Sequence, residues 1–143
     1  MAIRFHFLKQ VKLLNRILLK EHLKELCRVE NRALVSLDFI FCSEEYLLQI
    51  NRQFLNHDYH TDIITFSLDD KDLDSVSGEI YISVDMVKSN TKLFGVSGNE
   101  ELHRVIFHGV LHLCGYRDKT AKEKVTMTAK ENENLKKYLY TVK

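Results

Sequence analysis

The chain has 143 residues, of which 45 % are hydrophobic and 29 % are charged, and its formal net charge is +1. This length suits a single domain with one core, here residues 1–143, and the composition is ordinary for a globular protein. The sequence contains no apolar run long enough to span a membrane and no signal peptide, so we expect a cytoplasmic protein without a membrane partner. The three cysteines lack C-x-x-C spacing and are typical of reduced core thiols: Cys27, Cys42 and Cys114.

The charges are unevenly distributed along the chain. Lysine and arginine outnumber the acidic residues in segments 1–32 and 102–143, whereas acidic residues dominate the segment between them. A basic face built from both ends could follow the phosphate backbone of a nucleic acid. The alternative is that these charges are the solvated faces of two terminal helices.

The first half of the chain contains two strand patterns and two helix patterns. Alternating apolar and polar residues predict strands over 3–7 and 33–42. Between them, leucines and isoleucines at helical spacing predict an amphipathic helix over about 9–27. Ser43 is followed by two acidic residues, so we expect it to cap a helix over about 44–56.

Two further strands are expected in the middle of the chain. Consecutive apolar and β-branched residues over 61–68 predict a strand that is buried on both faces. An acidic, turn-rich connection over 69–77 leads to a strand over 78–84. A helix that Ser83 or Asp85 can cap should then run to Phe94, where glycines interrupt the chain.

The last part of the chain is predicted to hold two helices. Ser97 or Asn99 can cap the first of them, which extends through His112, and a capping box of Thr120 and Glu123 begins the second, which runs to about residue 140. We expect its buried side to consist of Val125, Met127, Leu135 and Leu139. Four strands and about five helices that alternate without segregating indicate an α+β, or mixed α/β, fold.

The pattern H-x-x-x-H-x-x-G-x-x-D, from His108 to Asp118, indicates a metal site. Two histidines four apart on a helix have Cβ atoms roughly 5–6 Å apart. Their imidazoles can therefore share one ion at about 2.0–2.1 Å, a normal zinc–nitrogen distance. Gly115 can end the helix in the left-handed conformation, and Asp118 can then offer a carboxylate to the same ion. We predict that His108, His112 and Asp118 bind one divalent ion and leave a position open for water or substrate.

Other interpretations of these residues remain open. Asp118 could instead cap the helix that starts near Thr120. His57 and His60, in a polar loop, form a rival metal pair. His103 is five residues before His108 and is expected to be exposed.

Two enzyme classes with similar ligand sets are less suitable. In metalloproteases with two histidines four apart, a glutamate after the first histidine acts as general base, but Gly109 stands here. Iron oxygenases also use two histidines and a carboxylate. Their histidines, however, are not usually paired in this way on a helix.

The motif resembles the H-G-x-L-H-x-x-G-Y-D-H signature of the YbeY family of endoribonucleases and ribosomal RNA maturation factors. The matching residues are His108, Gly109, Leu111, His112, Gly115 and Tyr116. A second stretch, over residues 50–66, resembles the family pattern L-N-x-x-Y-R-x-x-D-x-x-T-D-V-L-S-F, and Gly78-Glu79-Ile80 resembles its G-D-I segment. Three departures from these patterns change the chemistry of the side chain: Asp118 stands where the family has histidine, Arg117 where it has aspartate, and Leu55 where it has arginine.

The resemblance implies a mixed four-stranded sheet with the metal-binding helix beside it. It also implies a metal-dependent endoribonuclease for single-stranded RNA that acts in ribosomal RNA processing, including maturation of the 3′ end of 16S RNA, and in ribosome assembly and quality control. Zinc is our first choice of metal, and the expected partners are ribosomal RNA and the small ribosomal subunit or its assembly factors. An alternative is a non-catalytic ribosome-assembly factor with a structural metal site.

Overall fold

The computed structural model describes residues 2–68 and 74–141 and has an α+β fold, as the sequence predicted. The strands are β1 (Ala2–Phe7), β2 (Ala33–Cys42), β3 (Ile63–Ser67) and β4 (Ser75–Ser83). The helices are α1 (Arg16–Val29), α2 (Glu44–Leu55), α3 (Val84–Phe94), α4 (Gly98–Leu113) and α5 (Ala121–Thr141). Most of the predicted acidic connection, residues 69–73, lies outside the described residues.

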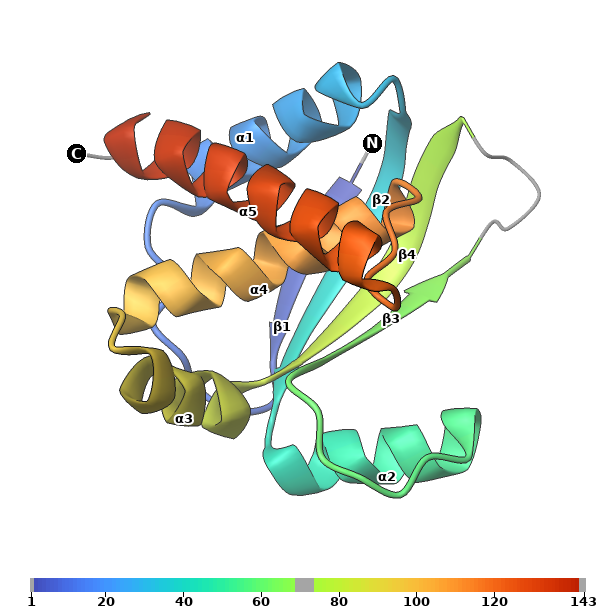
Figure 1. Ribbon diagram of the computed structural model, residues 1–143. Coiled ribbons are helices and arrows are strands. Elements are labelled where there is room, and N and C mark those ends of the chain that lie inside the picture. Colours follow the sequence, from blue (N-terminus) through green and yellow to red (C-terminus); the bar gives the residue numbers. More distant parts are fainter. Residues whose placement is uncertain (1, 69–73, 142–143) are drawn as a thin grey trace.

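The strands form one mixed sheet in the order β1-β2-β4-β3. Strands β1, β2 and β4 run parallel, and β3 pairs antiparallel with β4 at one edge (Figure 1). The prediction that the strand around residues 61–68 is buried on both faces was wrong, because in β3 only Ile64 is fully buried. An edge strand has a neighbour on one side only, and its apolar residues here pack against single helices.

Three helices cover one face of the sheet. Helices α1 and α4 lie on the strands, and α5 packs outside against both of them (Figure 1). Their apolar residues meet those of β2 and β4 in the main core, which includes Leu23, Phe39, Ile80, Ile106 and Phe107. Helix α2 packs against β3 and β4 over a separate small cluster that contains Cys42, Leu47 and Ile64.

The first helix begins later than predicted, at Arg16 rather than near residue 9. The backbone N–H groups of Leu8 and Lys9 both donate to the carbonyl of Phe41 on β2, so this stretch is tied to the sheet and cannot also form helical hydrogen bonds. Leu13 is nevertheless buried, which explains why the segment carries apolar residues at apparently helical spacing. Asn15, in the left-handed conformation, precedes the first turn of α1.

The other helix starts agree with the predicted caps. Ser43, Ser83 and Ser97 each accept a hydrogen bond from the backbone N–H three residues later. These caps satisfy N–H groups that would otherwise lack partners at the starts of α2, α3 and α4. In the described part of the chain, no helix is both long and apolar enough to cross a membrane.

Candidate metal centre

Helix α4 is the central helix of the molecule and carries both histidines of the motif. It is apolar around most of its circumference because it lies between the sheet and α5. Its buried apolar side chains are Leu102, Val105, Ile106, Phe107, Val110 and Leu111. The side chains of His108 and His112 are only 20 % and 28 % exposed, so their polar atoms need partners.

Gly109 lets α4 approach the sheet closely next to His108. A Cβ atom at this position would lie 2.8 Å from Ile63 Cδ1 and 2.9 Å from Ile80 Cγ2, which is closer than carbon atoms normally pack. The glycine therefore allows the helix to rest directly on β3 and β4. This contact sets the distance between His108 and the edge of the sheet.

The turn after α4 brings Asp118 back toward the two histidines. Gly115 has φ 108°, a conformation that favours glycine, and its N–H donates to the carbonyl of His112 at 3.0 Å. The hydroxyl of Tyr116 donates to Glu30 on α1 at 2.7 Å and anchors the turn from the other side. The chain thus reverses within a few residues, as the glycine in the motif predicted.

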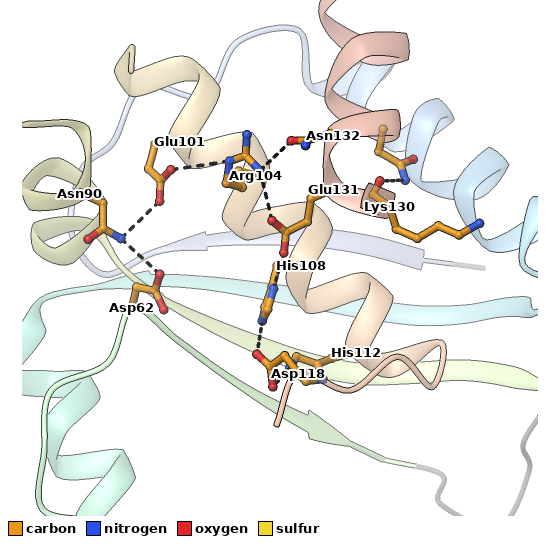
Figure 2. A network of polar contacts seen from close by, with 11 residues as sticks. Asp62, Asn90, Glu101, Arg104, His108, His112, Asp118, Lys130, Glu131 and Asn132 are labelled. Carbon is orange, nitrogen blue, oxygen red and sulfur yellow. Dashed lines mark hydrogen bonds and ion pairs between the residues drawn. The ribbon is translucent and has the colours of Figure 1, made fainter. Parts of the chain in front are cut away.

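The three predicted ligand residues lie together (Figure 2). Asp118 Oδ2 is 3.3 Å from His108 Nε2, and Asp118 Oδ1 is 3.5 Å from His112 Nε2. All three ligand atoms lie within 4.8 Å of one another. Ligands at zinc distances of about 2.0–2.1 Å in tetrahedral geometry lie about 3.3–3.4 Å apart. The donor set and its spacing therefore suit one small divalent ion.

Glu131 on α5 belongs to the same site and was not predicted from the sequence. Its Oε2 lies 2.6 Å from His108 Nδ1, on the side of the ring away from Asp118. The signal for it was present, because Glu131 lies four residues after Met127 and four before Leu135, both of which are buried. A glutamate at helical spacing within an apolar stripe requires a polar partner.

The acidic neighbours of His108 determine its protonation. Burial alone would lower the pKa of this imidazole, but the hydrogen bond with Glu131 and the negative charges of Glu131, Asp118 and Asp62 outweigh burial, so the pKa of His108 is raised. A metal ion needs the neutral imidazole and must therefore displace a proton at acidic pH.

A cleft of about 280 Å³ opens beside His108 and Asp118. Asp62, Asn90, Glu101 and Arg104 line it, and Asn90 Nδ2 donates to both Asp62 and Glu101 at 3.3 and 3.2 Å (Figure 2). Burial raises the pKa of Asp62 and of Glu101. The cleft could admit a substrate group next to the candidate metal position.

The guanidinium of Arg104 is committed to protein partners in this cleft. It donates to Glu131 Oε1 at 3.2 Å and to Asn132 Oδ1 at 3.0 Å. Leu55, at the position where the resembling family has arginine, ends α2 and is 39 % exposed. Arg104 is therefore a cation that lines the cleft, but its guanidinium is hydrogen-bonded to the carboxylate of Glu131.

The other histidines and the cysteine near the motif do not join the candidate metal site. Among the described residues, only His108, His112 and Asp118 form a group that could hold a metal ion, and His57 instead contacts the hydroxyl of Tyr59. The expectation that His103 is exposed was wrong, because it is 1 % exposed beneath Tyr138 of α5. Cys114 is buried in the main core, as expected for a core thiol.

Comparisons with known proteins agree with this architecture. Residues 6–139 match the model of a protein family described as endoribonuclease YbeY. A protein of that name from Cytophaga hutchinsonii is 48 % identical over 127 residues, which cover 88 % of this chain and 87 % of the relative. One from Bacteroides thetaiotaomicron is 45 % identical over 115 residues, 80 % of this chain and 82 % of the relative. The solution structure of a Thermotoga maritima protein has a TM-score of 0.65 at 32 % identity and covers 96 % of this chain and 89 % of that one.

Proposed function

This chain belongs to the endoribonuclease YbeY family, and from that premise we propose that it hydrolyses single-stranded RNA with one divalent metal ion held by His108, His112 and Asp118. The observation that carries this proposal is the convergence of the three side chains, with ligand atoms within 4.8 Å of one another, beside an open cleft. Two imidazoles and one carboxylate suit zinc, which is our first choice.

When bound, the ion would polarise a phosphoryl oxygen and make a water molecule a better nucleophile. The chain's own residues prepare this position. The two imidazoles present Nε2, the turn after Gly115 delivers the Asp118 carboxylate, and Gly109 seats the helix against the sheet. The buried apolar residues of α4 keep these groups in place, so that little reorganisation is needed when substrate arrives.

RNA binding is supported by the arrangement of the two basic ends. Helices α1 and α5 contact each other, although they are distant in sequence (Figure 1). Both carry exposed lysines, namely Lys24 on α1 and Lys122, Lys124 and Lys136 on α5. Such a surface can follow a phosphate backbone, and binding should then weaken as salt increases.

We place this activity in ribosomal RNA processing, including maturation of the 3′ end of 16S RNA, and in ribosome assembly and quality control. The basis is family membership, and the small ribosomal subunit or its assembly factors are the expected partners. A cytoplasmic location follows from the same role.

A second candidate function is that of a non-catalytic assembly factor in which the ion only pins α4 to the turn before α5. Leu55 favours it, because it replaces the family's arginine with an uncharged side chain. In this case metal removal would lower thermal stability and leave RNA binding intact.

The test combines metal analysis with cleavage of single-stranded RNA. Protein purified without chelator should contain about one divalent ion per chain, and the double variant His108→Ala, His112→Ala should contain none. Chelator should abolish RNA cleavage, and added zinc should restore it. A double variant with its full metal content would move the site elsewhere, and RNA cleavage that survives complete metal removal would exclude the metal-dependent mechanism.

A further inference from the structure

Glu131 is an acidic residue buried in an apolar helix face. It is 7 % exposed and lies on the side of α5 that packs against α4. Removing a carboxylate from water is costly unless each oxygen finds a donor. Both oxygens of Glu131 have such a partner, and the two partners lie one turn apart on α4.

The two oxygens are used separately. Oε1 accepts from the guanidinium of Arg104 at 3.2 Å, and Oε2 lies 2.6 Å from Nδ1 of His108 (Figure 2). Arg104 is held in turn by Asn132 on α5 at 3.0 Å. The carboxylate is therefore fixed on one side by an arginine and faces the imidazole with the other.

This contact determines which ring nitrogen carries the proton. A carboxylate only accepts hydrogen bonds, and the contact of Nδ1 with Glu131 at 2.6 Å is much shorter than that of Nε2 with Asp118 at 3.3 Å, so a single ring proton is held on Nδ1. In the neutral ring of His108, Nδ1 then carries the hydrogen and Nε2 has the free lone pair. Nε2 is the atom that faces Asp118, so the proton and the lone pair point in the directions that metal binding requires.

We propose that Glu131, held by Arg104, is a positioning residue of the metal centre: it locks His108 in the Nδ1–H tautomer and aims Nε2 at the ion. This inference rests on the proposed function, since it concerns the same ion. It makes α5 part of the metal centre, although all three ligands precede that helix. Carboxylates that hold a ligating histidine in this way typically change metal affinity by about 10–100-fold.

The two histidines differ in the number of carboxylates that contact their rings. In the described part of the chain, His112 has no carboxylate against the other side of its ring, and its polar contact is with Asp118. The described residues therefore hold the ring of His108 from both sides and that of His112 from one side only.

Glu131→Gln is the decisive variant because it keeps the shape of the side chain. In the same pose, glutamine places an NH2 donor where one of the two oxygens was, so it turns an acceptor to only one of Arg104 and His108. Glu133→Gln is the matched control: it lies on the same helix and is 47 % exposed, and its carboxylate contacts Lys137 and Lys130 instead of a histidine.

Two measurements test the proposal. Nitrogen NMR of the metal-free protein, at a pH high enough for His108 to be neutral, should show a single Nδ1–H tautomer in wild type and in Glu133→Gln, and loss of that single tautomer in Glu131→Gln. Zinc affinity, measured against a competing chelator, should fall by about 10–100-fold in Glu131→Gln and remain unchanged in Glu133→Gln. Arg104→Gln, which keeps the carboxylate but frees it, should weaken zinc binding less than Glu131→Gln does, and it provides a second test if Glu131→Gln melts early.

The outcomes separate this inference from the proposed function. Wild-type affinity and a retained single Nδ1–H tautomer in Glu131→Gln would overturn the role of Glu131. Wild-type protein that binds no divalent ion would overturn the proposed function, whereas the tautomer of His108 in the metal-free protein would still decide the role of Glu131.

Discussion

In the turn before α5, Thr120 caps the helix and Asp118 faces the two histidines. Thr120 Oγ1 accepts from the N–H of Glu123 at 3.1 Å, and Glu123 Oε1 accepts from the N–H of Thr120 at 2.9 Å. This reciprocal pair is a complete capping box. The helix therefore does not need Asp118 as its cap, and the carboxylate of Asp118 is available to the two imidazoles.

Removal of Asp118 should weaken metal binding. We expect Asp118→Ala to bind zinc less tightly than wild type in a chelator competition, because one of three ligands is gone. Asp118→His should retain zinc and shift RNA cleavage toward lower pH, since a neutral ligand leaves more positive charge at the ion and acidifies its water further. Unchanged zinc affinity in Asp118→Ala, with only a cap-sized loss of stability of about 1 kcal/mol, would contradict this role.

At the scale of residues, the sequence predicted what is local. His108, His112 and Asp118 lie within one motif, so helical geometry and one glycine sufficed to bring them together. Glu131 and His103 could not be placed, because their surroundings depend on how α5 packs against α4. Apolar residues occupy most of the circumference of α4, so their spacing does not show which side of α4 another helix covers.

At the scale of elements, most predictions were correct because each rests on a pattern within a short stretch of sequence. The caps at Ser43, Ser83 and Ser97 involve neighbouring residues, and the β2 pattern spans the whole strand. The start of α1 failed because its first predicted turns are hydrogen-bonded to β2, a long-range contact. The prediction that the strand over 61–68 is buried on both faces failed for the same reason, because the edge position of β3 depends on the pairing of distant segments.

The contact of α4 with the sheet can be tested at Gly109. We expect Gly109→Ala to lower the free energy of unfolding by about 1–3 kcal/mol, because the added methyl group overpacks against Ile63 and Ile80. Moving the helix away from the sheet should also displace His108, so zinc affinity should fall in the same variant. Denaturant titration and chelator competition measure the two effects.

Gly98→Ala is the control for this substitution. Gly98 is in the same helix, and a Cβ atom there would meet no atom within 4 Å. This variant should be as stable as wild type or slightly more so, because alanine restricts the unfolded chain. Equal behaviour of the two variants would contradict the tight packing at Gly109.

At the scale of the whole molecule, buried histidines link folding to pH. Burial lowers the pKa of His103 from 6.5, partly opposed by the hydrogen bond to the carbonyl of Asn99. Below pH 6.5 the unfolded chain therefore binds a proton at this residue that the folded chain does not take up. The stability from a neutral His103 is fully present above pH 6.5 and is lost as the pH falls. His108 acts oppositely in the metal-free protein, since its pKa is raised.

Comparison of wild type with His103→Gln isolates this effect. Unfolding by denaturant, with chelator present, should show the largest stability difference between the two proteins above pH 6.5 and a smaller difference in acid. The contribution of His108 is common to both proteins and cancels. A stability difference that stays constant from neutral to acidic pH would contradict a neutral, buried His103.

The place of α5 at the end of the described chain affects how the protein matures. Synthesis runs from the amino to the carboxyl terminus, so His108 and His112 emerge before Glu131. On the role proposed for Glu131, a nascent chain that has not yet released α5 has its imidazoles but lacks the group that orients the first of them. Metal binding at full affinity would then have to wait until α5 has emerged and packed against α4.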